Sequence, residues 1–124
     1  MKNKRMLTVT VLAIVFFSGV VAGQVNLNTM RLPQFENESV KVWKSTVVPN
    51  SPLPLHRHEH PRVIIALTGG SMKIAEENGE SEVHQWETGK AYWLPANRPG
   101  TQHSDVNVGD KPIEVMVVEL LNEH

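Results

Sequence analysis

The chain has no cysteine among its 124 residues. Disulfides, thiolate metal sites and cysteine nucleophiles are therefore excluded. Aromatic residues make up only 6% of the chain, and no segment beyond residue 22 keeps the 3.6-residue apolar period of an amphipathic helix. The net charge is −1, and no basic patch of the kind that binds nucleic acid is present. What remains is a chain rich in β-branched residues that must fold without covalent cross-links.

The first 22 residues have the pattern of a secretory signal peptide. Three basic residues precede an apolar run over residues 7–21, and Val20-Val21-Ala22 suits cleavage after Ala22. A spanning helix needs about 20 apolar residues, so an uncleaved membrane anchor is the weaker alternative. We expect an exported chain, periplasmic or secreted, without stable membrane insertion. At about 100 residues the mature chain fits one domain.

The rest of the chain has the pattern of strands. Residues 23–39 are polar, and we expect a flexible arm there, or an edge strand around Met30-Arg31-Leu32. Thr68-Gly69-Gly70-Ser71 and Glu77-Asn78-Gly79-Glu80 are both predicted hairpin turns. Short β-branched runs separated by Gly or Pro predict an all-β sandwich or barrel over residues 40–121. The predicted strands are 40–48, the histidine segment, 62–67, 71–76, 82–86, 91–94, the segment around His103, and 113–121.

The segment His56-Arg57-His58-Glu59-His60 holds three of the six histidines. Residues two apart on a strand share a face, so His56 and His58 would direct both imidazoles to one point. His103, in a later strand, is the third candidate. Histidine nitrogens bind several divalent metals, so a metal site is predicted whose ion (Fe, Mn, Zn, Cu or Ni) the sequence leaves open. The alternative is a solvated histidine-rich loop.

Two groups of residues resemble the sequence motifs of the cupin superfamily. The matching positions are His56, His58 and Gly69 for the first motif and Gly89, Pro95, Gly100, His103 and Asn107 for the second. The resemblance implies a double-stranded β-helix, or jelly-roll barrel, over about residues 40–121. It also implies a metal site on His56, His58 and His103, and it allows a metal-dependent oxygenase or isomerase, including dioxygenase-type activity. A homodimer is a further expectation by analogy.

Arg62 stands where the family has an acidic metal ligand. Arginine stays protonated and offers no lone pair, so it cannot bind a metal. Three alternatives follow: a three-histidine site, a site in which Glu59 or His60 becomes the fourth ligand, and a metal-free pocket for an anionic small molecule. Arg62, His60 and Glu59 are our candidates for ligand contact, although Arg62 could instead pair with Glu59 or Glu114. The chain is then a metal-binding barrel, or a non-enzymatic binding or accessory barrel.

Overall fold

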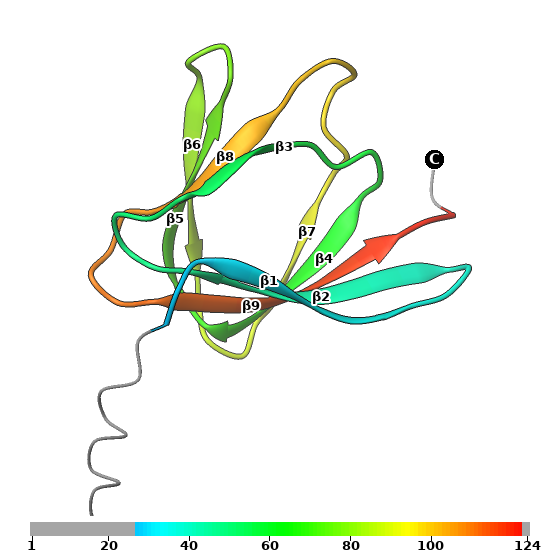
Figure 1. The fold of residues 1–124 in the computed structure, drawn as a ribbon, viewed down its shortest axis with the longest axis horizontal. Coiled ribbons are helices and arrows are strands. Elements are labelled where there is room, and N and C mark those ends of the chain that lie inside the picture. Colours follow the sequence, from blue (N-terminus) through cyan, green and yellow to red (C-terminus); the bar gives the residue numbers. More distant parts are fainter. Residues whose placement is uncertain (1–26, 123–124) are drawn as a thin grey trace, which may run out of the picture.

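The computed structural model describes residues 27–122, so the predicted signal peptide lies outside the described part. The described residues form nine strands in two antiparallel sheets that face each other as a barrel (Figure 1). The all-β prediction is thus confirmed. One sheet has the order β1-β2-β9-β4-β7 and the other β3-β8-β5-β6. The strands are β1 (Met30–Glu36), β2 (Val40–Val47), β3 (Leu53–His56), β4 (Arg62–Thr68), β5 (Gly70–Glu76), β6 (Ser81–Trp86), β7 (Ala91–Leu94), β8 (His103–Asn107) and β9 (Ile113–Leu120).

The barrel interior changes from apolar to polar along the central strands. On β4 and β9, the facing pairs Ala66–Val115 and Ile64–Val117 are buried and apolar, whereas the next inward pair is Arg62–Glu119. Alternate residues of a strand share a face, so this change of character lies inside the barrel. The polar end of the interior therefore begins at Arg62. The apolar core consists of Trp43, Val47, Leu53, Ile64, Ala66, Met72, Trp86, Ile113, Val115 and Val117.

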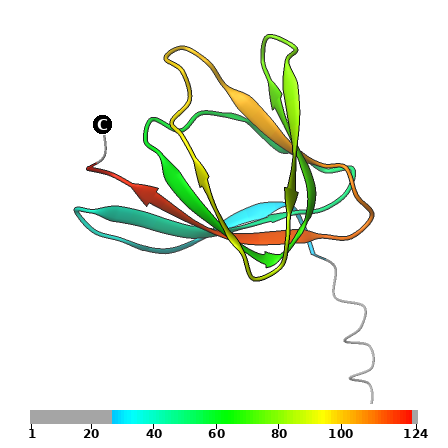
Figure 2. The same cartoon turned by 180° about the vertical axis from the view of Figure 1, so that it is seen from behind.

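Residues 30–36 form an edge strand and not part of a flexible arm. β1 pairs antiparallel with β2, from Met30 opposite Thr46 to Glu36 opposite Lys41. The register shifts between Pro33 and Phe35, where proline has no N–H to donate to the ladder. The alternative of an edge strand around Met30-Arg31-Leu32 is thus confirmed, and the flexible arm expected over residues 23–39 is wrong for residues 30–36, because the open edge of β2 offers backbone partners to them. β1, light blue in Figure 2, is the edge strand of the five-stranded sheet, next to β2.

The predicted hairpin at Thr68-Gly69-Gly70-Ser71 is wrong. β4 and β5 belong to different sheets, so the chain crosses from one sheet to the other at the two glycines. A Cβ at Gly69 would collide with the backbone oxygen of Trp86 and lie 2.9 Å from the Thr88 nitrogen. Glycine is required because the chain passes directly over the β6–β7 connection.

The described residues contain no helix that is long and apolar enough to span a membrane.

Asn107, at the end of β8, ties the β8–β9 connection to β2. Its buried Nδ2 donates to the carbonyls of Val47 at 2.9 Å and Lys111 at 2.6 Å, and its Oδ1 accepts from the Gly109 N–H at 2.9 Å. Asn107→Ala leaves these groups unpaired and should lower the free energy of unfolding by about 2–3 kcal/mol, measured by urea titration. Asn28→Ala, at an exposed position, should change it by less than about 0.5 kcal/mol. Equal losses in the two variants would contradict this role.

Candidate metal centre

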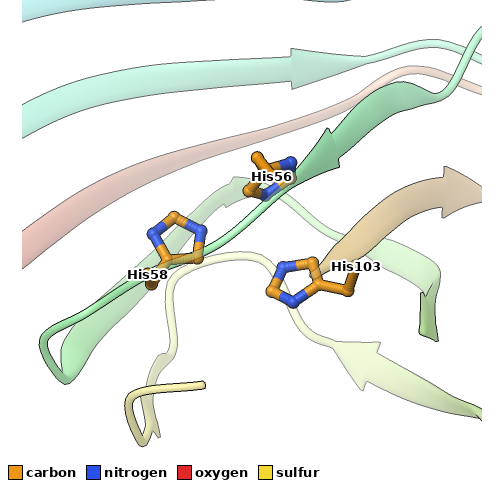
Figure 3. A group of neighbouring side chains, drawn as sticks. All are labelled: His56, His58 and His103. Carbon is orange, nitrogen blue, oxygen red and sulfur yellow. The ribbon is translucent and has the colours of Figure 1, made fainter. Parts of the chain in front are cut away.

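Three histidines from two segments converge inside the barrel (Figure 3). His56 ends β3 and lies opposite His103, the first residue of β8. His58 follows two residues later. The three side chains each offer a nitrogen, and these atoms all lie within 4.8 Å of one another. The structure therefore brings together the three residues that the sequence indicated.

His58 reaches this point for a reason other than the one expected from strand geometry. β3 ends at His56, so His58 is not on the strand. Its N–H donates to Asn97 Oδ1 at 2.6 Å, and the Asn97 N–H donates back to its carbonyl at 2.9 Å. Its ring also stacks on Trp43, with the centroids 5.9 Å apart and the planes 6° from parallel. The β7–β8 loop and a core tryptophan thus hold His58 in place.

Burial keeps these imidazoles neutral. His103 is 2% exposed and His58 is 5% exposed. Burial lowers the pKa of His58 to about 2, with the positive charge of Arg62 adding to the effect. Burial also lowers the pKa of His103 to about 4, and the neighbouring His56 and Arg62 add to it. Neutral imidazole is the form that binds a metal ion, because protonation uses the lone pair.

His56 is oriented as a metal-binding histidine is. Its Nδ1 lies 2.7 Å from the Pro54 carbonyl oxygen, which can only accept, so Nδ1 carries the proton. The lone pair is therefore on Nε2, which is buried without a hydrogen-bond partner, as is Nε2 of His103. A histidine that donates one ring N–H to a carbonyl and presents the other nitrogen is the usual arrangement around metals. The donor set and the two unpartnered nitrogens fit a divalent ion.

Asn97 holds His103 in the opposite tautomer. Because Asn97 Oδ1 accepts from the His58 N–H, its Nδ2 faces His103 Nδ1 at 3.0 Å and donates to it. Neutral His103 then carries its own proton on Nε2. For Nε2 to bind an ion, that proton must move to Nδ1, where it needs an acceptor. The amide of Asn97 provides one only by turning over, which gives up its bond from His58.

For an ion bound at the three histidines, this conflict would make Asn97 a determinant of the metal affinity. In Asn97→Asp, the carboxylate can accept from both His58 N–H and His103 Nδ1–H, so we expect metal binding about tenfold tighter. Asn97→Leu should bind more weakly than the wild type, because it removes both bonds. Chelator competition measures both changes. Asn78→Asp, in the exposed β5–β6 turn, controls for added negative charge, and equal tightening there would argue against a specific role of Asn97.

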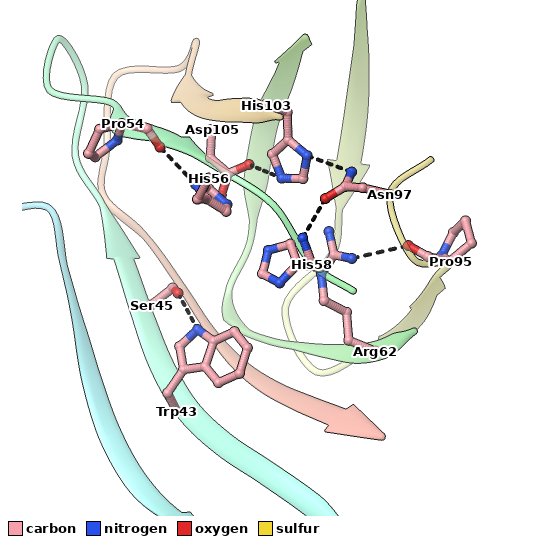
Figure 4. Close-up of polar contacts among 10 residues, drawn as sticks. All are labelled: Trp43, Ser45, Pro54, His56, His58, Arg62, Pro95, Asn97, His103 and Asp105. Carbon is pink, nitrogen blue, oxygen red and sulfur yellow. Dashed lines mark hydrogen bonds and ion pairs between the residues drawn. The ribbon is translucent and has the colours of Figure 1, made fainter. Parts of the chain in front are cut away.

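The Arg62 side chain points into the barrel and does not form the ion pair with Glu59 or Glu114 that the sequence allowed. It is 5% exposed, and its Nη1 donates to the Pro95 carbonyl at 3.1 Å (Figure 4). Burial lowers its pKa to about 10, so it remains protonated at neutral pH. The ion pairs considered with Glu59 and Glu114 are not formed, since Glu59 lies 4.0 Å from Arg57 and Glu114 pairs with Lys44 at 3.3 Å. The cation is therefore a feature of the site.

Two spaces adjoin Arg62. A pocket of about 590 Å³, open to solvent, is lined at its buried end by Arg62, Asn97 and His103. A cavity of about 30 Å³ inside the barrel is also lined by Arg62, together with His58 and Asp105. A small molecule entering the open pocket would therefore meet both the guanidinium and a histidine of the cluster. The exposed rim of the pocket includes Glu76, Glu80, Glu82, His84 and Arg98.

The other two candidates from the sequence do not join the cluster. Glu59 is 72% exposed in its side chain, and His60 is half-buried; among the described residues, the histidine group includes neither. Sequence reasoning missed Asp105 and Asn97. Asp105 could have been found, since it lies two residues after His103 and so shares its face of the predicted strand. Asn97 is a loop residue, and no local pattern indicates its role.

Comparisons with known proteins find relatives by structure and none by sequence. No family model matches the chain, and no curated protein matches it significantly. A cupin domain from Bordetella pertussis Tohama I is 25% identical, with a TM-score of 0.65, covering 77% of this chain and 96% of that one. An RmlC-like cupin from Methanocaldococcus jannaschii is 17% identical, with a TM-score of 0.59 and coverage of 75% and 80%. A double-stranded β-helix protein from Klebsiella pneumoniae is 20% identical, with a TM-score of 0.57 and coverage of 81% and 84%.

Proposed function

Because this chain has the double-stranded β-helix fold of the cupin superfamily, we propose that it binds a divalent metal ion and, beside it, a small anionic molecule. The observation that carries the proposal is the convergence of His56, His58 and His103 inside the barrel, with two buried Nε2 atoms that lack a partner. An unpaired buried polar atom costs about 1–3 kcal/mol. A bound ion would offset that cost.

The three histidines would hold the ion and leave positions open for a ligand. Zn, Fe, Cu and Ni all accept imidazole nitrogen, and such an ion supplies a Lewis acid. His56 is pre-oriented by Pro54, and His58 is held by Asn97 and Trp43. These contacts fix the directions of two imidazoles before any ion arrives. Pre-organised ligands bind more tightly, because less freedom is lost on binding.

Arg62 is the proposed contact for the anion. Its planar guanidinium can donate two parallel hydrogen bonds to a carboxylate, and it lines the 590 Å³ pocket next to His103. Arg98 lies 3.8 Å from both Glu76 and Glu80 and so offsets part of the negative charge at the pocket rim. We therefore expect a small carboxylic acid to bind with its charged end at Arg62.

Turnover is a further step for which the site offers less support. Glu59, the carboxylate of the histidine segment, faces solvent beside Arg57 and is not placed to act as a general base in the pocket. Dioxygenase-type chemistry therefore stays a prediction from the family resemblance, and binding is the function that we propose. Export likewise stays a prediction from residues 1–22.

The test is to prepare the metal-free chain and titrate it with Zn, Fe, Mn, Cu and Ni ions. We expect one ion per chain and an increase in the melting temperature, because an ion that binds only the folded state stabilises it. Elemental analysis after dialysis measures the stoichiometry. A chain that stays empty with all five metals would rule out the metal-binding proposal.

A second candidate function is favoured by the charge of Arg62. Burial is the main cause of the lowered pKa of His58 and His103, and the Arg62 guanidinium adds to it, so Arg62 opposes further positive charge at the site. On this alternative the barrel binds an anion without any metal. A thermal-shift screen of small carboxylic acids separates the two functions. Stabilisation that persists in His56→Ala with no metal added would favour the metal-free pocket.

A further inference from the structure

Asp105 places a carboxylate against two of the three histidines. It lies two residues after His103 on β8, and its side chain is 17% exposed. Its Oδ2 is 3.6 Å from His56 Nε2, and its Oδ1 is 3.5 Å from His103 Nε2. Figure 4 shows the carboxylate lying beside both rings. One carboxylate therefore faces the two nitrogens that the structure leaves unpartnered.

Both separations are longer than a typical hydrogen bond and close to the distance between two ligands of one ion. A hydrogen bond between N–H and oxygen has a typical length of about 2.9–3.0 Å. Around a tetrahedral zinc ion with bonds of about 2.0–2.1 Å, neighbouring ligand atoms lie about 3.3–3.4 Å apart. The tautomer of His56 is a second reason to place a metal ion between His56 and Asp105. Its Nε2 presents a lone pair, because Nδ1 donates to Pro54, and a lone pair facing a carboxylate is stabilised by a cation between them.

The Asp105 carboxylate also supplies negative charge that offsets the positive charge of Arg62 near the proposed ion. Arg62 brings a positive charge into the polar end of the barrel, where a divalent ion needs negative charge. The three histidine nitrogens lie within 4.8 Å of one another, and the Asp105 carboxylate approaches this group from the side of His56 and His103. Asp105 and His58 also line one internal cavity.

We propose that Asp105 is the carboxylate ligand of the metal centre, binding the ion together with His56, His58 and His103. The carboxylate ligand would thus come from β8, because β4 has Arg62 at the position where the family has an acidic ligand. This inference rests on the proposed metal-binding function. It predicts a mixed nitrogen and oxygen site with three histidines and one aspartate.

The experiment uses cobalt(II) as the probe and a cysteine as the reporter. Since the chain has no cysteine, Asp105→Cys introduces the only thiol. A thiolate that binds cobalt(II) gives a near-ultraviolet charge-transfer band. We expect that band in Asp105→Cys and not in Asp110→Cys, whose position is exposed in the β8–β9 connection. Asp105→Asn keeps the shape of the side chain and should weaken zinc binding about 10–100-fold, with Asp110→Asn unchanged.

The outcomes separate this inference from the function on which it rests. If wild type binds zinc and His56→Ala does not, while Asp105→Asn binds within threefold of wild type and Asp105→Cys gives no band, then Asp105 is not a ligand and the histidine site stands. If wild type binds neither zinc nor cobalt, both proposals are wrong. Urea titration of each variant shows whether it is folded, and the cobalt band in folded Asp105→Cys decides the matter even if Asp105→Asn proves unstable.

Discussion

His103→Ala is expected to abolish binding of the divalent ion, with a loss in affinity of at least about 100-fold. Replacing groups that only orient metal ligands already costs 10–100-fold, and His103 is itself one of the three proposed ligands. It lies at the centre of the site, opposite His56 in the β3–β8 register and next to Asn97. Competition with a chelator, followed by elemental analysis, measures the loss.

The controls separate lost ligation from lost structure. His103 is fully buried, and truncation leaves a cavity that costs stability. His103→Gln keeps most of the volume and should lose metal binding equally. His84→Ala removes a histidine at the pocket rim that pairs with Glu82, and it should change the affinity less than threefold. A His103→Gln chain that binds one ion at wild-type affinity, or an equal loss in His84→Ala, would contradict the role assigned to His103.

Local patterns predicted much of this fold. The run 91–94 and the Asn78-Gly79 turn predicted β7 and the β5–β6 hairpin, because apolar alternation and turn chemistry act within a few residues. The two glycines at 69 and 70 misled the prediction. A turn signal does not say whether the next strand returns to the same sheet or crosses to the other, since that choice depends on contacts far apart in the sequence, such as the close approach of Gly69 to the Trp86 backbone.

The candidate site also has a part that could be predicted from the sequence and a part that could not. His56, His58 and His103 could be grouped from their spacing and from the order of the two family motifs. The contacts that orient them could not. Asn97 holds His58 and His103 from a loop 39 residues after His58, and the β3–β8 register brings Asp105 to His56. Such long-range contacts follow from barrel closure and leave no periodic trace in the sequence.

Arg62→Glu is the second substitution with a large expected effect. It replaces a positive charge beside His58 and His103 with the carboxylate that the family has at this position, so metal affinity should rise about tenfold or more. Without metal the same change should destabilise the fold by about 3 kcal/mol, because it buries an unpaired acid opposite Glu119 and leaves the Pro95 carbonyl without its donor. The melting temperature should therefore rise more on adding metal than it does in the wild type.

Arg62→Met separates the two contributions to this effect. It removes the charge and keeps an unbranched side chain, so it should relieve repulsion without adding a ligand, and its metal affinity should lie between those of the wild type and Arg62→Glu. Both variants should lose the stabilisation by small carboxylic acids that we expect for the wild type. Equal metal affinities in Arg62→Glu and Arg62→Met would mean that a carboxylate at position 62 does not reach the ion. Retained carboxylate binding in both would mean that Arg62 is not the anion contact, because the guanidinium is the group on which that proposal depends.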